Sequence, residues 1–368
     1  AGATPDHGSI SGLDARDPRP RERSTTSFRH RSSTHVNPKA IIMKRRTLLG
    51  TLGIMGLSVP LAACSSKSSG SGSSGTGKKV KIGITQIVTH SSLDAAREGF
   101  KKAITDAGFN ASFDEQNAQG DQGTAASIAT KLASENLDLV LAIATPAAQA
   151  AAQAITNVPI VFTAVTDPKS ADLVASNDAP GGNVTGTSDM NPVADQIGLI
   201  KQIKPDATSV GILYSSGEVN SQVQVNLAKE AAAKDGLSVQ EKTITTTGEL
   251  QQAAQALNVD SIYIPTDNNV VSGLSTVIQV CEDRKIPLIS AEGDSVRNGA
   301  VITYGIDYTE LGRQTGEMAV KILNGDAKPA TMPVETQKNL KLYVNEKAAS
   351  LMGVTIPDDL ASKAEKVG

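Results

Sequence analysis

The sequence contains no tryptophan, only two cysteines, and five residues each of phenylalanine and tyrosine. Three of its four histidines lie in the first 42 residues, so His90 is the only one in the rest of the chain. A single histidine is too few for a histidine-based metal site and makes Ser-His-Asp catalysis improbable. We therefore expect no metal, no cofactor and no enzymatic activity.

The segment from Met43 to Ala63 has the order of a secretory signal peptide. The positive head Lys44-Arg45-Arg46 is followed by an apolar run, Leu48–Ala62, and by small residues before Cys64. This run of about 15 residues is shorter than the ~20 residues that a spanning helix needs. Leu-Ala-Ala-Cys resembles a bacterial lipobox, which implies cleavage before Cys64 and lipid on that residue. The alternative is an ordinary secreted protein with a chance cysteine there.

The flanking segments carry little sign of a fold. Residues 1–42 are rich in Pro, Ser and Arg, and we interpret them as a non-native or disordered extension, with Met43 as the start. Residues 64–79 are mostly Ser and Gly and predict a flexible tether. Residues 1–63 hold ten of the 35 basic and four of the 38 acidic residues, so the remainder has a net charge of about −9. Nucleic acid is therefore not an expected partner.

From residue 80 onward, short apolar runs alternate with helical segments, and the alternation starts again near residue 193. Such alternation is typical of βαβ units on a parallel sheet with helices on both faces. Strands are expected at 80–85, 111–116, 138–144, 158–164, 209–214, 238–243, 261–265 and 287–290. Helices are expected at 92–107, 123–135, 146–156, 193–203, 221–235, 248–257, 269–284 and 308–323.

The predicted fold class is α/β, with two doubly wound lobes joined by a multi-strand hinge. We expect the first lobe to comprise residues 80–188 and 305–327, and the second residues 189–304 and 328–368. A remaining thiol, Cys281, lies in an apolar helix-like stretch and is expected to be a small buried residue. With Cys64 assigned to lipid, one thiol cannot form an internal disulfide.

Ligands of open α/β sheets bind outside the carboxyl ends of the strands, so polar residues that follow strands are the site candidates. Thr145 opens a helix with Pro146 at its first turn, an arrangement that favours a carboxylate but also serves simple capping. Asp267 and Asn268 follow an apolar strand and either hold an ammonium group or cap a helix. Asp307 lies where the chain is expected to pass between the lobes for a second time, near residues 301–307, and either pairs with a ligand cation or braces the hinge.

Two further residues carry open interpretations. Tyr304 is a candidate for stacking on the ligand, and a core position is the alternative. His90 lies near a helix start, where it is either a ligand contact or a surface or capping residue.

At these positions the chain resembles the substrate-binding proteins of ABC importers, in the branch associated with tryptophan and tyrosine-type uptake. The resemblance covers roughly residues 80–357 and rests on the order and spacing of several segments. They are Gly83–Val88, Leu93–Phe100, Ala144–Gln149, Val165–Pro168, Asn183–Asp189, Tyr263–Asn268 and Tyr304–Tyr308, with Leu311-Gly312 after them.

The resemblance implies a type I periplasmic-binding-protein fold that captures a small amino-acid-like ligand between its lobes. It suggests ligand contacts at Gln86, Thr145, Ala147, Asp167, Asp189, Asp267, Asn268 and Asp307. One segment departs from the pattern: where relatives read Glu-His-Pro-Ala-Leu-Asp, this chain has Thr89-His90-Ser91-Ser92-Leu93-Asp94. The shortage of aromatic residues makes the side-chain pocket less certain than the fold.

We therefore expect a monomeric, lipid-anchored extracytoplasmic receptor that closes on its ligand and delivers it to an ABC permease and its ATPase. An α-carboxylate would lie near Thr145, and an α-ammonium near Asp267 or Asp307. A sugar or nucleoside receptor on the same fold, a sensory lipoprotein and a surface enzyme are the alternatives. The first would use aromatic stacking faces, of which this sequence has few; the last needs an activated nucleophile or a metal.

Overall fold

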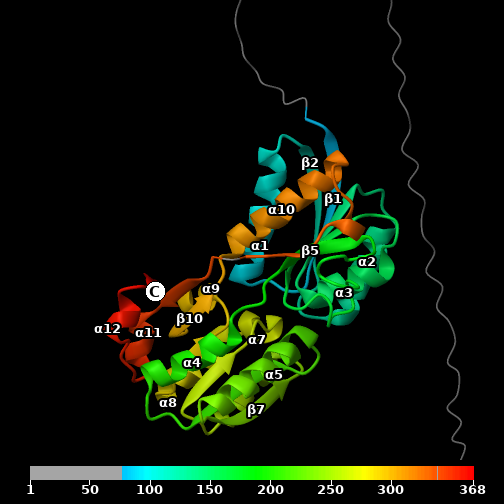
Figure 1. Ribbon diagram of the computed structural model, residues 1–368. Helices are drawn as coiled ribbons and strands as arrows, with labels where there is room; N and C mark the ends of the chain where they lie inside the picture. The colour runs from blue at the N-terminus through cyan, green and yellow to red at the C-terminus, as the bar shows by residue number, and fades with distance from the viewer. Residues whose placement is uncertain (1–76, 338) are drawn as a thin grey trace, which may run out of the picture. The chain divides into compact units, whose positions relative to one another are not determined.

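The computed structural model describes residues 77–337 and 339–368. The expected signal peptide, most of the tether and Cys64 lie outside these residues. Residues from Lys79 onward form two α/β lobes, each built around a sheet with helices on both faces (Figure 1). The expected doubly wound α/β class is confirmed.

The first lobe holds a six-stranded, all-parallel sheet in the order β11-β5-β4-β3-β1-β2. Every residue of β3 and β4 is buried, as expected of central strands covered on both faces. Its strands are β1 (Lys79–Gln86), β2 (Asn110–Asn117), β3 (Leu139–Ile143), β4 (Ile160–Val165), β5 (Val184–Ser188) and β11 (Glu335–Thr336).

The second lobe holds a seven-stranded sheet in the order β13-β12-β10-β9-β8-β6-β7. Its strands are parallel except at the β10–β12 pair, which is antiparallel. They are β6 (Ser209–Ser215), β7 (Ser238–Ile244), β8 (Ser261–Ile264), β9 (Leu288–Ser290), β10 (Ile302–Gly305), β12 (Lys341–Val344) and β13 (Glu365–Lys366).

Helices pack in pairs against the sheets: α1 with α10 and α2 with α3 in the first lobe, α4 with α5 and α6 with α8 in the second. Within the described ranges, no helix is both long and apolar enough to cross a membrane. The α-helices are α1 (Ser91–Asp106), α2 (Gln122–Ala133), α3 (Thr145–Ala154), α4 (Val193–Ile203), α5 (Val219–Lys234), α6 (Leu250–Gln255), α7 (Asn268–Ser272), α8 (Leu274–Arg284), α9 (Gly293–Arg297), α10 (Tyr308–Asn324), α11 (Glu346–Leu351) and α12 (Asp358–Ala361), with 3₁₀ turns at Thr247–Glu249 and Pro329–Thr331.

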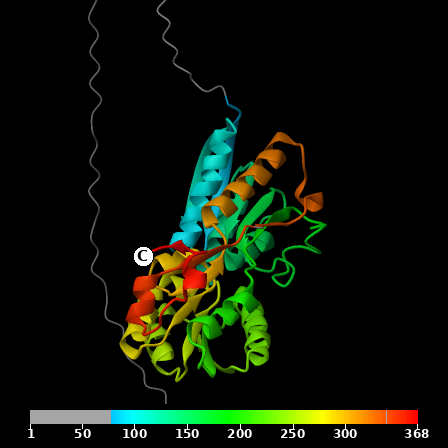
Figure 2. The same ribbon diagram turned by 60° about the vertical axis from the view of Figure 1, so that its left-hand side comes forward.

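Helices α1 and α10 lie side by side, although more than 200 residues separate their first positions (Figures 1 and 2). Their contact depends on glycines, because a Cβ at Gly312 would collide with the carbonyl oxygen of Ala96, and one at Gly99 with that of Thr309. The backbones of α1 and α10 are thus in direct contact, with no space for a side chain between them. The amino terminus of α1 is therefore held firmly to the first lobe.

The chain crosses between the lobes after β5, after β10 and again before β12. The third crossing comes later than the expected boundary at residue 328, because β11 pairs in parallel with β5 in the first lobe. The segment before it is polar and rich in proline, so it carries no strand pattern that could have revealed this edge strand.

The helix expected at 269–284 is two helices, α7 and α8, which meet at Gly273. A Cβ at this glycine would run into the side chain of Leu250, so the backbone passes directly against α6. The break sets the direction of α7, whose amino terminus carries Asp267 and Asn268.

Candidate ligand-binding site

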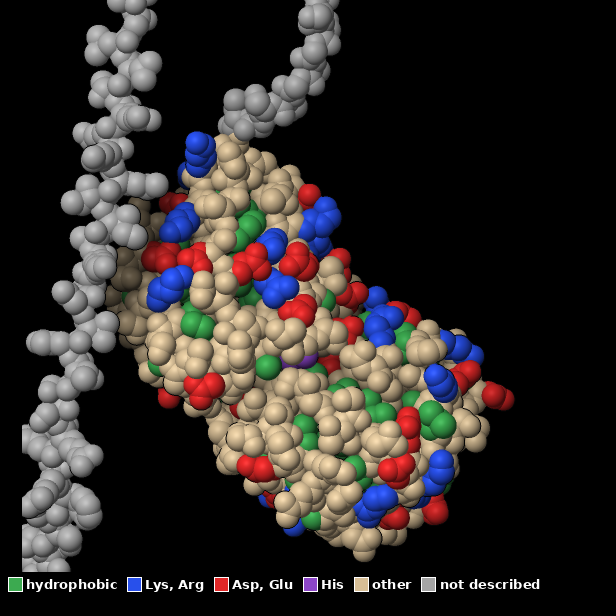
Figure 3. Space-filling view, turned by 180° about the vertical axis from the view of Figure 1, so that it is seen from behind, with side chains coloured by type: hydrophobic (Ala, Val, Ile, Leu, Met, Phe, Trp, Pro, Cys, Tyr) green, Lys and Arg blue, Asp and Glu red, His purple; other side chains and the backbone are tan. Residues whose placement is uncertain are grey.

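The carboxyl ends of the two sheets contribute to one enclosed cavity between the lobes. Its volume is about 10 Å³, which is room for about one water molecule. The surface narrows where the lobes meet, and acidic and basic side chains are interspersed on both lobes of this face (Figure 3). The cavity is lined by His90, Leu93, Ala164, Asp189, Thr266, Asp267, Asn268, Val271, Glu292 and Tyr308.

Asp189 is the carboxylate that the first lobe contributes to this cavity. It follows β5 and is 3% exposed. Its Oδ1 accepts a hydrogen bond from the Thr166 hydroxyl at 3.0 Å, and its Oδ2 accepts one from the Tyr308 hydroxyl at 2.8 Å. Burial raises the pKa of Asp189, and the two hydrogen bonds act in the opposite direction. A carboxylate offers about four acceptor positions, so Asp189 retains two.

Asp267 is the facing carboxylate in the second lobe, and it is fully buried. It caps α7 by accepting a hydrogen bond from the backbone N–H of Val270 at 2.9 Å. Its other oxygen accepts from the Ser215 backbone N–H and the Ser221 hydroxyl, both at 2.6 Å. These three bonds tie α7 to β6 and α5. Burial raises the pKa of this carboxyl.

Glu218 lies behind Asp267 and anchors the same helix. Its carboxylate accepts hydrogen bonds from the backbone N–H and the side-chain amide of Asn268, at 3.1 and 2.6 Å, and from the Asn220 amide at 2.9 Å. Burial, followed by the negative charge of Asp267, raises the pKa of Glu218 to about 8. Asn268 is thus oriented by Glu218.

Glu292 is the third buried acid of the second lobe, and together with Asp267 and Glu218 it forms what we call the acidic wall. It caps α9 by accepting hydrogen bonds from the backbone N–H groups of Asp294 and Ser295, each at 3.0 Å. Its Oε2 also accepts a hydrogen bond from the Ser92 hydroxyl of the first lobe at 2.5 Å. Burial, with a further contribution from the charge of Asp294, raises the pKa of Glu292 to about 7.

His90 lies immediately before α1 and lines the cavity. Burial lowers the pKa of its imidazole to about 4, and the side chain of Asn268 and the charge of Asp94 oppose this shift. The ring is therefore neutral at physiological pH, and its buried Nδ1 has no hydrogen-bond partner within the described residues. His90 is a cavity residue that makes no helix cap through its side chain.

The start of α3 lies on the same sheet edge. Thr145 is 2% exposed, and its buried hydroxyl has no hydrogen-bond partner within the described residues. Pro146 follows, and Ala147 is completely buried. Ala144, which follows β3, and Ala164, which lies in β4, have positive φ values of 75° and 56°. Residues with strained backbone of this kind are concentrated at binding sites, so these two alanines mark this sheet edge as a candidate binding site.

Thr145 and Ala147, both expected as ligand contacts, do not line the cavity. Two further residues expected at the site, Gln86 and Asp167, bond to neighbouring groups instead. The Gln86 amide donates to the Val88 carbonyl and to Asp94, each at 2.8 Å, so it braces the loop before α1. Asp167 accepts bonds from the hydroxyl of Ser170 and from nearby backbone N–H groups, and so closes a turn on the surface. Neither residue lines the cavity.

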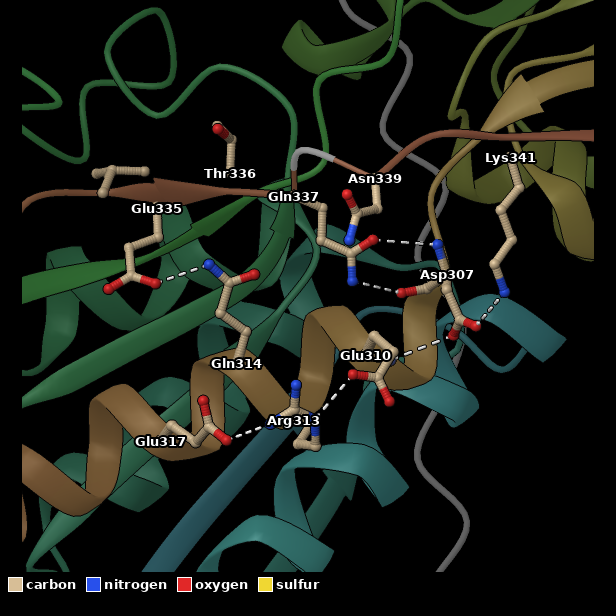
Figure 4. Close-up of a pocket in the computed structure, with 11 residues that line it drawn as sticks. Asp307, Glu310, Arg313, Gln314, Glu317, Glu335, Thr336, Gln337, Asn339 and Lys341 are labelled. Carbon is tan, nitrogen blue, oxygen red and sulfur yellow. Dashed lines mark hydrogen bonds and ion pairs between the residues drawn. The ribbon is translucent and has the colours of Figure 1, made fainter.

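Asp307 lies in the hinge, on a separate polar groove of about 720 Å³ between α10 and the third crossing (Figure 4). It caps α10 by accepting a bond from the Glu310 backbone N–H, and its Oδ2 pairs with the Lys341 ammonium at 3.3 Å. The Gln337 amide bonds to both the N–H and the carbonyl of Asp307, at 3.2 and 3.0 Å. These contacts link the second and third crossings.

Tyr304 takes the alternative role that the sequence left open. Its ring is part-buried against the core of the second lobe, and it does not line the cavity. Its backbone carbonyl accepts a hydrogen bond from the Gln196 amide at 2.6 Å.

Three residues at or behind the cavity were not foreseen. Tyr308 lines it, whereas Glu218 and Ser92 bond to the lining residues Asn268 and Glu292. Tyr308 was expected only as the start of a helix and within a family segment, and Glu218 lies in the turn between β6 and α5. No periodic pattern marks either residue. Among the described residues, no group of acidic, histidine or cysteine side chains has the spacing of a metal site. Cys281 is buried, and burial raises the pKa of its thiol to about 12.

A family model described as ABC transporter substrate binding protein matches residues 81–368. The chain belongs to this family. As a substrate-binding protein of the ABC class it is extracytoplasmic. It is 41% identical to a tyrosine-binding protein of Clostridioides difficile, over 83% of this chain and 92% of the relative.

Solved structures of the same family are also similar. A Streptococcus pneumoniae protein in complex with L-Trp shares 38% identity and a TM-score of 0.76, covering 79% of this chain and 100% of the other. A Clostridium difficile substrate-binding protein described as ligand-free and open shares 45% identity and a TM-score of 0.60. This match covers 78% of this chain and 99% of the other. The substrate-binding protein thus resembles the L-Trp complex more closely in shape, despite the lower identity.

Proposed function

We propose that this substrate-binding protein captures a zwitterionic amino acid, aromatic in type, and delivers it to an ABC permease and its ATPase. The observation that carries the proposal is the arrangement of the cavity. It offers a buried carboxylate with free acceptor positions, Asp189. Outside the cavity lining, at the carboxyl edge of the same sheet, α3 begins with Thr145, whose buried hydroxyl has no partner among the described residues. One recognises a positive group and the other a negative group.

Asp189 is the proposed partner of the α-ammonium group. Of the two facing aspartates, Asp267 already accepts three hydrogen bonds from its own lobe, whereas Asp189 accepts two. Asp307 is directed to Lys341 in the hinge. A charge-assisted hydrogen bond to a buried carboxylate contributes about 1.5–3 kcal/mol.

The α-carboxylate is assigned to the start of α3. Among the described residues, no Lys or Arg lines the cavity. The backbone N–H groups and the positive end of the dipole of α3, which lies outside the lining, are therefore the proposed anion-binding groups. The Thr145 hydroxyl supplies an additional donor.

The side chain of the ligand is assigned to the apolar part of the cavity lining, Leu93, Ala164 and Val271, beside the ring of Tyr308. An aromatic side chain is proposed because this chain is 41% identical to the tyrosine-binding relative and 38% identical to the L-Trp-bound one over the aligned residues. A volume of about 10 Å³ cannot hold an amino acid, so the lobes must separate to admit one. Binding and closure need no covalent step, and we propose no catalysis.

The lipid anchor on Cys64 belongs to the same proposal. The cysteine lies outside the described residues, and the sequence before it supports cleavage and lipidation. A Ser/Gly-rich tether would then allow the two lobes to reach a permease from the membrane surface.

A thermal-shift panel tests the ligand class. The purified chain is heated with L-Tyr, L-Trp, L-Phe, the remaining amino acids, N-acetyl-L-Trp, several sugars and nucleosides. A ligand at 100 times its Kd adds about 2.7 kcal/mol of stability, so we expect a clear rise in Tm with an aromatic amino acid. N-acetylation removes the ammonium group and should abolish the rise. A rise with sugars or nucleosides alone would contradict the amino-acid assignment.

A further inference from the structure

Two consecutive serines at the start of α1 reach from the first lobe to the second. The Ser92 hydroxyl donates to Glu292 Oε2 at 2.5 Å, and both residues are at most 2% exposed. The Ser91 hydroxyl accepts a hydrogen bond from the Asn298 amide at 3.1 Å on the surface. These bonds join the first turn of α1 to both ends of α9.

Both sides of this contact are firmly held within their own lobes. Helix α1 is locked against α10 where Gly99 and Gly312 leave no space between the backbones. On the other side, Glu292 is fixed by the backbone N–H groups of α9 that it caps. Neither partner can follow the other when the lobes separate, so both hydrogen bonds must break on opening.

The remaining polar contacts between the lobes are of a different kind. The Thr166 hydroxyl shares a hydrogen bond with the Thr266 hydroxyl at 3.1 Å and accepts one from the Gln224 amide at 3.5 Å, all neutral groups. The Gln122 amide donates to the Gly217 carbonyl at 2.9 Å on the exposed rim. The Ser92–Glu292 bond is the one in this set that joins a buried carboxylate to a donor across the lobes. A hydrogen bond to a charged group is roughly twice as strong as a neutral one.

We propose that Ser91 and Ser92 act as a latch that holds the two lobes closed in the absence of ligand. Closure is then favoured by the protein's own residues before any solute is captured. The ligand adds its contacts to a closed state that already exists. This inference does not depend on which ligand binds, because both latch bonds are made between residues of the protein.

The latch is tested by measuring the distance between the lobes in ligand-free protein. Spin labels are attached to cysteines introduced at Lys102 and Glu230, exposed positions on α1 and α5, in the full chain carrying Cys64→Ser. The distance distribution of this parent should be dominated by the closed state. At about pH 8.5, where Glu292 is ionised, Ser92→Ala should lower the closed-to-open ratio about tenfold, the size expected for one hydrogen bond to a charged group. Ser91→Ala should have a smaller effect in the same direction.

Ser127→Ala is the matched control, because Ser127 is an exposed serine of α2 whose hydroxyl bonds only within its own helix. It should leave the distance distribution unchanged. Alanine is a good helix former, and the Tm of each ligand-free variant verifies that it is folded. The latch is ruled out if the parent is predominantly open without ligand, or if the folded Ser92→Ala and Ser91→Ala variants keep the parent's distance distribution.

Discussion

The two lobes contribute buried carboxylates of different kinds to the cavity between them. In the second lobe, Asp267, Glu218 and Glu292 each accept three or more hydrogen bonds, most of them from the ends of the short helices α7 and α9. In the first lobe, Asp189 accepts two bonds and caps no helix. The comparison shows that counting occupied acceptor positions separates an acid that builds the wall from one that can receive a ligand.

Replacing the most heavily used acid should have the largest effect on stability. Asp267→Ala leaves the Ser215 N–H, the Ser221 hydroxyl and the Val270 N–H without their acceptor, each in a buried position. We expect the free energy of unfolding to fall by about 3 kcal/mol, measured by urea denaturation.

Asp121→Ala provides the matched comparison for this loss. Asp121 caps α2 through the backbone N–H and the hydroxyl of Thr124 at an exposed position. Its loss should cost about 1 kcal/mol. Equal losses for the two variants would show that burial of the Asp267 network contributes nothing to stability.

The raised pKa of Glu218 should make the free energy of unfolding depend on pH. Because its pKa is raised from 4.5 to about 8, the folded state binds a proton that the unfolded state has released. The free energy of unfolding therefore falls as the pH rises through this window. Between pH 6.5 and 8, Glu218→Gln should flatten this fall by about 1.5 kcal/mol, while the contributions of His90 and Glu292 remain in both proteins.

The Tm of each variant, measured by calorimetry across this interval, checks the prediction. The introduced glutamine can still accept hydrogen bonds through its carbonyl oxygen, so the Glu218→Gln variant should fold. Glu230→Gln, an exposed change on the same lobe, should keep the wild-type slope. A wild-type slope in Glu218→Gln as well would mean that another group causes the pH dependence.

The sequence predicted much of the fold because its central elements have clear periodicity. The all-apolar run at β3, the amphipathic pattern of α10 and the glycine after α1 identify these elements directly. The edge strand β11 was missed because two paired residues carry no pattern. The break between α7 and α8 depends on the approach of Leu250, which a local pattern does not contain.

The site was predictable in place but not in detail. Residues after strands do cluster at one edge, as Asp189, Asp267 and Asn268 do. Whether such a residue faces the cavity depends on its partners in space. Asp307 follows β10 as Asp189 follows β5, yet Lys341 and the Gln337 amide lie beside it in the hinge. Those partners come from a later crossing of the chain, so only the tertiary structure identifies them.

The central claim is that Asp189 receives the positive group of the ligand, and calorimetric titration tests it most directly. The aromatic amino acid that gives the largest rise in Tm is titrated into wild type, Asp189→Asn and Asp167→Asn. Asparagine keeps the shape of the side chain but removes its charge. We predict that Asp189→Asn weakens binding about 30-fold, while Asp167→Asn, which changes a surface turn, stays within about twofold of wild type. Wild-type affinity in a folded Asp189→Asn variant would contradict the account.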